Sequence, residues 1–193
     1  MAKLRKFVAY RTVERPNTRV SKFRKKSYVR AKPNLKVVRF DMGNVKREYE
    51  VALHLLTRSA LQIRQEALEA ARITSNRLLD KKVGKNNFHL RVRVFPHHIL
   101  RENPLAAGAG ADRFSTGMSH PFGKPIGLAA QLRKGQPVMT LLVNREHIKA
   151  GRLALHRAAY KIPCSTLIKE EQLMKAVKQA QVEKKSSTSG SAA

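Results

Sequence analysis

The segment from Gly117 to Lys124 is the first place to look for chemistry, because a glycine-rich run that ends in lysine can bind phosphate. Its sequence, GMSHPFGK, places five residues between the two glycines, whereas a P-loop has four. Pro125 stands where a P-loop has the Ser or Thr hydroxyl that binds magnesium. The segment therefore predicts no nucleotide-binding loop.

The neighbouring glycines and acid are no more promising. Gly108 and Gly110 begin no dinucleotide fingerprint, because Arg113 stands where the third glycine is needed. Asp112 is the one carboxylate in this stretch, and the adjacent Arg113 makes it an ion-pair partner rather than a general base. We predict no catalytic residues here.

Histidine and cysteine side chains also fail to form a site in the sequence. His97 and His98 are adjacent, so on an extended chain they point opposite ways and cannot chelate one metal. His89, His120 and Cys164 are the other soft ligands considered, and they are too few and too scattered for a zinc site. The lone cysteine has no marked histidine base, and burial explains it more simply. We predict no metal, no cofactor and no enzymatic activity.

Net charge is the most informative property of the chain. Its 193 residues include 40 Lys and Arg against 13 Asp and Glu, which gives a net charge of +27 and a pI of about 11.2. Such a charge needs a polyanion, and nucleic acid is the first candidate. An anionic membrane surface is the second, but no apolar run approaches the roughly 18 residues of a spanning helix, and no signal peptide is evident. We expect a cytoplasmic, one-domain protein with extensions.

Residues 1–36 form a basic arm with 13 cations and a single acid, Glu14. Four aromatic residues are spaced between the cations: Phe7, Tyr10, Phe23 and Tyr28. Cations contact phosphates, and aromatic rings either stack on unpaired bases or hold the arm against the domain. A solvated tail is the alternative, although disordered tails are usually poor in aromatics. We expect an arm that is irregular alone and ordered on RNA.

Residues 103–127 are predicted to form one long functional loop. Five of the ten glycines lie between Gly108 and Gly127, together with Pro121 and Pro125. These residues disfavour a helix or a central strand. Loops of this length inside a compact domain usually have a function.

The remaining pattern predicts an α+β domain over residues 37–168, followed by a C-terminal helix and a disordered tail over 169–193. The expected strands are Val37–Asp41, Tyr49–Leu56, Phe88–Phe95, a hairpin of Leu128–Leu132 with Pro137–Val143, and Cys164–Ile168. Three helices are expected. The first begins at Thr57 or Ser59 and ends at about Lys82, and the second runs from Arg145 to about Tyr160 after an Asn144 cap. The third runs from Glu170 to Val182.

Two of these elements have predicted faces. In the first helix, Ser59 and Gln62 have capping-box spacing, and the core stripe is Ala60, Ile63, Ala67, Ala70, Thr74 and Leu78. Phe88–Phe95 alternates, with Phe88, Leu90, Val92 and Val94 toward the core and His89, Arg91 and Arg93 outward. We expect Arg91 and Arg93 to contact phosphates.

Four segments resemble a known family. ALEAAR (67–72), FHLRVRV (88–94), GADRFSTGM (110–118) and FGKPIGLAA (122–130) resemble the archaeal and eukaryotic large-subunit ribosomal protein "ten-e", whose bacterial counterpart is large-subunit protein sixteen. The likeness is dense from about Val37 to Tyr160. Ile162–Leu167 departs from the eukaryotic pattern, which suggests an archaeal source, and Pro104–Ala107 departs at the entry to the loop.

The resemblance implies a hammerhead-type α+β fold that binds large-subunit rRNA near the 5S rRNA, contacts neighbouring ribosomal proteins, and extends its long loop toward the peptidyl-transferase centre and tRNA. It also implies contact with late maturation or export-adaptor factors. The expected rRNA-binding residues are Lys3, Arg5, Lys6, Arg11, Arg15, Arg19, Lys22, Arg24, Lys25, Lys26, Arg30, Arg91, Arg93 and Lys124. The expected tRNA-proximal residues are Arg101, Ala106, Ala107, Gly108, Ala109, Gly110, Ala111, Asp112, Arg113, Phe114, Ser115, Thr116, Gly117, Met118 and Ser119.

Two other functions remain open at this point. A chromatin-type DNA-binding protein would suit the charge, but no helix-turn-helix or zinc-finger signature is evident. An RNA-modifying enzyme would need a cofactor loop or an acid–base pair, and neither is found. A ribosomal, non-enzymatic role is the leading hypothesis.

Overall fold

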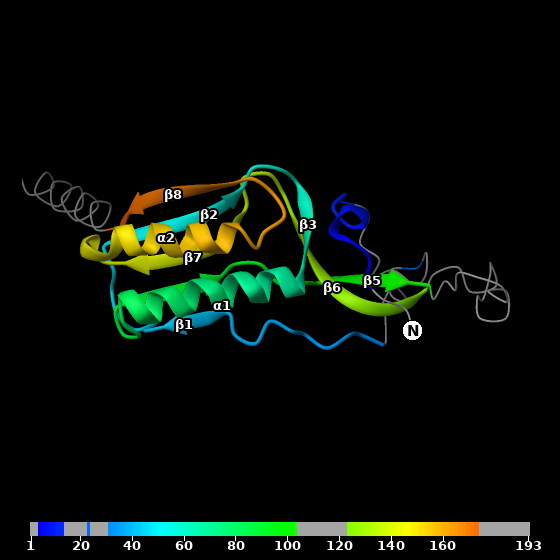
Figure 1. Ribbon diagram of the computed structural model, residues 1–193, viewed down its shortest axis with the longest axis horizontal. Helices are drawn as coiled ribbons and strands as arrows, with labels where there is room; N and C mark the ends of the chain where they lie inside the picture. Colours follow the sequence, from blue (N-terminus) through cyan, green and yellow to red (C-terminus); the bar gives the residue numbers. More distant parts are fainter. Residues whose placement is uncertain (1–3, 14–22, 24–30, 104–122, 174–193) are drawn as a thin grey trace, which may run out of the picture.

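The computed structural model describes residues 4–13, 23, 31–103 and 123–173. Within these residues the chain forms two sheets, two α-helices and short 3-10 turns, so the predicted α+β class is confirmed. Figure 1 shows the two sheets one after the other along the long axis of the molecule.

The larger sheet has five antiparallel strands in the order β1-β4-β7-β2-β8. Its strands are β1 (Asp41–Gly43), β2 (Val51–Thr57), β4 (Phe88–Val92), β7 (Pro137–Val143) and β8 (Thr166–Gln172). The nearly all-apolar β7 lies at the centre, as expected for a strand that is covered by neighbours on both edges.

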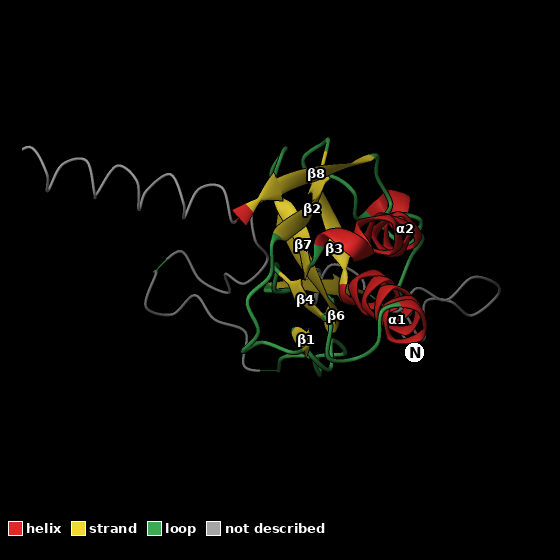
Figure 2. Ribbon diagram, turned by 90° about the vertical axis from the view of Figure 1, so that its left-hand side faces the viewer, coloured by secondary structure: helices red, strands yellow, loops and turns green. Residues whose placement is uncertain are grey.

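Both α-helices cover one face of this sheet, as Figure 2 shows. They are α1 (Gln65–Lys82) and α2 (Ile148–Ala159). Leu53, Leu90 and Leu141 of the sheet are fully buried beneath them. Gly151 lets α2 approach closely, since a Cβ there would come within 2.9 Å of Leu53 Cδ1 and 3.0 Å of Leu141 Cδ2. The main hydrophobic core therefore lies between this sheet and the helices.

The smaller sheet has three antiparallel strands in the order β3-β6-β5, with β3 (Leu61–Arg64), β5 (His98–Glu102) and β6 (Lys124–Leu132). The long connection between residues 102 and 124 leaves from the end of this sheet. Glu102 is the register partner of Lys124, and Gly123 has φ +69 with its missing Cβ directed at the backbone of Glu102 and Asn103. The base of the connection is therefore narrow and fixed.

The predicted start of the first helix was wrong. Leu61–Arg64 is β3, the helix begins at Gln65, and its N-cap Arg64 has no side-chain capping bond. The Ser59–Gln62 capping box therefore does not exist, because Gln62 pairs with Gln131 in the sheet. The buried positions of α1 are also shifted from the predicted stripe, and they are Gln65, Leu68, Ala71, Ser75, Leu78 and Leu79. The end of the helix is confirmed, with Lys81 and Lys82 in the last turn and Gly84 at φ +86.

The predicted hairpin was also wrong. β6 and β7 are consecutive, but β6 pairs with β3 and β5, whereas β7 pairs with β2 and β4. The turn between them bends the chain from one sheet to the other. The predicted loop ended too late, because Lys124–Gly127 belongs to β6, the central strand of its sheet. Pro125 is tolerated there because the β5–β6 register is irregular between Leu100 and Arg101.

Other boundaries moved by a few residues. The strand expected at Val37–Asp41 is β1 at Asp41–Gly43, and the one expected to reach Phe95 ends at Val92. β8 occupies Thr166–Gln172, so the helix predicted from Glu170 does not begin there. Leu173 is helical, and the rest of that prediction lies outside the described residues. A 3-10 turn, Arg145–His147, precedes α2, and Asn144 makes no side-chain cap bond.

Candidate nucleic-acid interface

The start of the basic arm is bound to the smaller sheet. The Tyr10 hydroxyl donates to Glu102 Oε1 at 2.6 Å, and Arg5 Nε lies 2.8 Å from Glu102 Oε2. Tyr10, Leu100 and Ala129 form a small buried cluster with Leu4 packed against it. Burial, together with the bond to Glu102, raises the pKa of Tyr10. The aromatic residues of the arm were predicted either to stack on bases or to hold the arm against the domain, and Tyr10 holds the arm.

The end of the arm follows helix α1. Gln65 Oε1 accepts from the Lys36 backbone N–H at 3.0 Å, and Glu69 Oε2 accepts from that of Val38 at 3.4 Å. Arg72 makes a two-pronged pair with Glu69 and is only 12% exposed. The hydrogen bonds from Arg72 lower the pKa of the Glu69 carboxyl. We call residues 34–38 the strap, since they lie along the helix by these bonds.

The face of the five-stranded sheet that the helices leave uncovered carries a row of polar residues. One register row crosses all five strands, from Asp41 through Arg91, Thr140 and His54 to Lys169. Asp41 Oδ1 lies 3.5 Å from Arg91 Nε, and His54 bonds Thr140 at 3.0 Å. Asp41 pairs with Arg91, and Thr140 and His54 separate this pair from Lys169, so the row gives no uniformly cationic surface.

His89 lies on that same face but is not the outward residue that we predicted. Its side chain bonds Asp41 Oδ1 at 3.0 Å, and the residue is only 8% exposed. The alternation of β4 was therefore assigned correctly, but the neighbouring strand covers the imidazole. Arg91 and Arg93, the other two outward predictions, are exposed.

The described cations of the predicted RNA-binding set lie in three places. Lys6 and Arg11 are exposed near the arm's 3-10 turn, Phe7–Ala9, while Arg5 is paired with Glu102. Lys124 is exposed at the start of β6. Arg101 lies in β5 and is partly buried, so it belongs to a strand and not to the loop. The rest of the set lies outside the described residues: Lys3, Arg15, Arg19, Lys22, Arg24, Lys25, Lys26, Arg30 and the loop positions 106–119.

One cationic group was missed at the sequence level. Arg58, Arg133 and Lys134 are exposed at the end where β2 turns to β3 and β6 turns to β7. The two turns are joined through Thr57, whose Oγ1 donates to the Arg133 carbonyl at 2.9 Å and whose carbonyl accepts from Gly135 N at 2.7 Å. We call Arg58, Arg133 and Lys134 the basic corner. The turn residues were recognised, but nothing local in the sequence brings Arg58 beside them.

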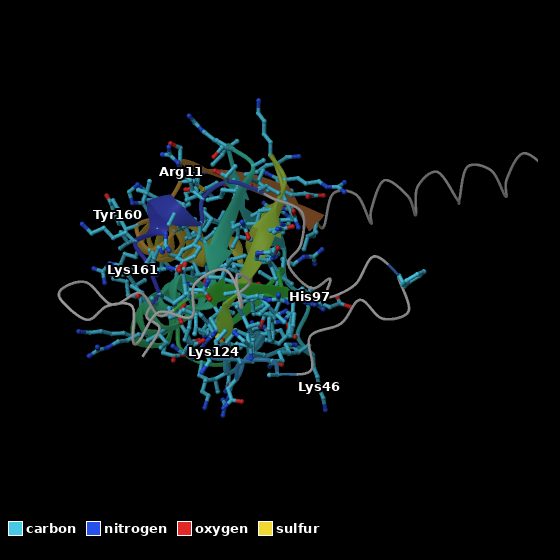
Figure 3. All side chains as sticks on the ribbon, turned by 90° about the vertical axis from the view of Figure 1, so that its right-hand side faces the viewer. Arg11, Lys46, His97, Lys124, Tyr160 and Lys161 are labelled. Atoms are coloured by element: carbon cyan, nitrogen blue, oxygen red, sulfur yellow. The ribbon has the colours of Figure 1, made fainter. Side chains whose placement is uncertain are left out.

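Figure 3 views the molecule from the end that carries the smaller sheet. Arg11, Tyr160 and Lys161 lie on the left of that view, and Lys124, His97 and Lys46 lie below or to the right. The four labelled cations, Arg11, Lys161, Lys124 and Lys46, therefore do not gather in one patch in this view.

The described residues offer no catalytic or metal centre. No three His, Cys, Asp or Glu side chains within them gather as metal ligands. Cys164 is partly buried, and burial raises the pKa of its thiol, which disfavours the nucleophilic thiolate. None of the described helices is both long enough and apolar enough to cross a bilayer.

Comparison with known proteins gives a consistent result. Residues 17–169 match the family model described as ribosomal protein L16p/L10e. "Large ribosomal subunit protein uL16" of Archaeoglobus fulgidus is 45% identical over 159 residues, which cover 82% of this chain and 88% of the relative. The protein of the same name from Methanoculleus marisnigri is 45% identical over 164 residues, covering 82% and 96%, and that from Methanococcus maripaludis is 44% identical over 165 residues, covering 86% and 92%. The resemblance drawn from the four sequence segments is thus confirmed, with archaeal relatives, and the chain belongs to the ribosomal protein L16p/L10e family.

Proposed function

We propose that this protein is a non-catalytic structural constituent of the large ribosomal subunit, in the cytoplasm, held to rRNA mainly through its surface cations. The main supporting observation is the net charge of +27 on a chain of this family. Each phosphate that a cation neutralises releases counterions, so many dispersed cations suit an extended RNA surface better than a single ligand.

The basic corner supports this proposal on the folded part of the chain. Its three side chains are exposed, and no salt bridge joins them to a carboxylate among the described residues. The backbone bonds at Thr57 fix the two turns relative to each other. A fixed group of cations without acidic partners loses little conformational entropy on meeting phosphates.

The arm and the long connection have separate proposed roles. The cations of residues 14–30, with Arg91, Arg93 and Lys124, bind rRNA near the 5S rRNA. The connection between β5 and β6 extends toward the peptidyl-transferase centre and tRNA, and it is where late maturation or export-adaptor factors act. Its narrow base at Glu102, Gly123 and Lys124 supports a directed projection.

Salt dependence tests the cationic contacts. Replacing Arg58, Arg133 and Lys134 together by Gln should reduce the log–log salt slope of rRNA binding by roughly 2–3, at about 0.7–0.9 per phosphate contact. The matched control replaces Lys36, Arg145 and Arg152 by Gln, because these exposed cations already pair with Glu66, Glu50 and Glu170. Equal slopes for both triple variants would contradict the proposed role of the corner.

The loop is tested inside the particle. Residues 106–119 are replaced by a glycine linker, and purified large subunits are assayed for protein stoichiometry, retained maturation factors and peptide-bond formation with full-length tRNA. Normal stoichiometry with reduced activity or retained factors is expected. Loss of the protein from the subunit would mean that the loop anchors it, and full activity with no retained factors would mean that the loop is only a spacer.

A further inference from the structure

Three rings form a column: Phe95 and His97 come from the segment that joins β4 to β5, and Phe40 lies directly before β1. The Phe40 and Phe95 rings are stacked, with centroids 5.5 Å apart and planes 21° apart. The His97 ring continues the column, with its centroid 4.5 Å from that of Phe95 and its plane tilted by 46°. Lys32 Nζ lies 5.4 Å from the centre of the Phe95 ring. The column therefore has a cation beside its middle ring.

Burial changes along this column. Phe40 is half-buried and packs against the main hydrophobic core, and Phe95 is half-buried as well. His97 is exposed. Phe40 packs against the core without help from the histidine, and the exposed His97 belongs to neither core cluster, so core packing does not account for its ring.

The backbone that carries the rings is fixed. The Val92 N–H donates to the Phe40 carbonyl at 2.8 Å, the Arg93 N–H to the Val138 carbonyl at 2.8 Å, and the His97 N–H to the Phe95 carbonyl at 3.0 Å. The outer ring is therefore held in place before any ligand arrives. A preorganised ring loses less freedom on binding than one on a mobile chain.

We propose that the His97 end of this column stacks on one unpaired base of ribosomal RNA. Single-stranded RNA is recognised by stacking its splayed bases on aromatic and histidine rings, with cations for the flanking phosphates. Lys32 supplies one such cation at the column, and the exposed Arg39 and Arg93 are close to the phenylalanines in sequence. The inference rests on the proposed function and adds a base contact to the phosphate contacts.

The test uses the full chain and two short single-stranded oligoribonucleotides that differ only at the central position, which is 2-aminopurine in one and abasic in the other. Stacking should quench the 2-aminopurine fluorescence. His97→Ala should abolish the quenching and weaken binding of the base-containing strand by about 5- to 150-fold, the range expected for one stacked base, while binding of the abasic strand stays unchanged. His97→Phe should retain the quenching, and His97→Lys should lose it despite its charge.

His156→Ala is the matched control, because it removes another exposed imidazole that contacts a single ring, that of Tyr160. It should leave the quenching intact, and an equal loss would overturn the inference. Equal weakening of both strands by His97→Ala would also overturn it. If both strands bind with a steep salt dependence but no base effect, the stacking inference alone fails, whereas failure of both strands to bind would count against the proposed function too.

Discussion

The two sheets of this protein are stabilised in different ways. The five-stranded sheet has two helices over one face and a core of fully buried residues such as Leu53, Leu141 and Leu155. The three-stranded sheet has a small cluster of Tyr10, Leu100 and Ala129, and it borrows Leu4 and Tyr10 from the arm. The first is stabilised by its own large buried core. The second shares that core through Leu61, Ile63, Ala130 and Leu132, and on its other side it depends on a segment far away in the sequence.

The difference separates folding from function. A large apolar core tolerates little change, because interiors are close-packed. The arm side of the smaller sheet is held by a small apolar cluster and by the bonds of Tyr10 and Arg5 to Glu102, and this sheet carries the connection for which we propose a role in the ribosome. We therefore expect substitutions in the first region to unfold the domain and substitutions in the second to release the arm without unfolding it.

The largest effect should come from Val92→Asp in β4. Val92 is 4% exposed, so the change buries an unpaired carboxylate. We expect the free energy of unfolding to fall by more than about 4 kcal/mol and the unfolding transition to lose its cooperativity. Urea unfolding followed by circular dichroism measures this. The companion variant, Arg91→Ala with Arg93→Ala, changes exposed residues of the same segment and should cost less than about 1 kcal/mol. Similar losses in both variants would show that the two faces are not distinct.

A pair of glycine substitutions compares the two regions directly. Gly151→Val should cost about 1–3 kcal/mol, because its side chain meets the packed Leu53 and Leu141 methyls. At Gly127 the atoms nearest to an added Cβ belong to the Leu4 side chain, with its two methyls at 3.2–3.3 Å, and the arm can move away. We expect nearly unchanged melting for Gly127→Val but faster proteolysis of the first residues. An equal fall in melting temperature would contradict the contrast between the sheets.

A smaller effect is expected from Tyr10→Phe, which removes the hydrogen bond to Glu102. The cost should be about 1–2 kcal/mol, confined to the smaller sheet. Amide hydrogen exchange should quicken in β5 and β6 but not in β2 or β7. Tyr49→Phe is the control in the other region, since its hydroxyl donates to the Asn44 carbonyl at 2.9 Å, and it should leave β5 and β6 unchanged.

The smallest effect should appear in acid, at the strap. The Arg72 hydrogen bonds lower the Glu69 pKa below its ordinary 4.5, so the unfolded chain binds the proton more readily than the folded one. Stability from this pair is therefore fully present above about pH 4.5 and is lost as the pH falls through the lower folded pKa. The protection of the Val38 amide against hydrogen exchange, relative to the unfolded chain, should fall over that pH window in the parent protein. Glu69→Gln should show the reduced protection of the Val38 amide already at neutral pH, with little further change in the acid window. An unaltered pH dependence of this protection would mean that the pair does not hold the strap.

Several local features could be predicted from the sequence because their causes are local. The alternation of Phe88, Leu90, Val92 and Val94 identified a buried strand face, and all four residues are buried. The Gly84 helix end also followed from a residue type with a specific backbone requirement. The family could also be predicted, because its motifs are short contiguous segments of the sequence.

Other features were wrong or missed because their causes are distant in the chain. Leu61–Arg64 fits a helix by spacing, but the neighbouring β6 makes it a strand. Leu128–Leu132 and Pro137–Val143 look like a hairpin, but separate partners draw them into different sheets. The basic corner and the Phe40–Phe95–His97 column also join residues that no sequence window contains together.

The sequence by itself determined the charge, the buried faces of the clearest strands and the family, because each depends on residue types or on short-range order. Only the tertiary structure decided which cations are already paired, which aromatic rings are stacked, and that the arm completes the smaller sheet. The physical reason is that pairing and burial depend on which distant segments meet. Arg5 and Arg93 are alike in the sequence, yet one is ion-paired with Glu102 and the other is exposed at the end of β4.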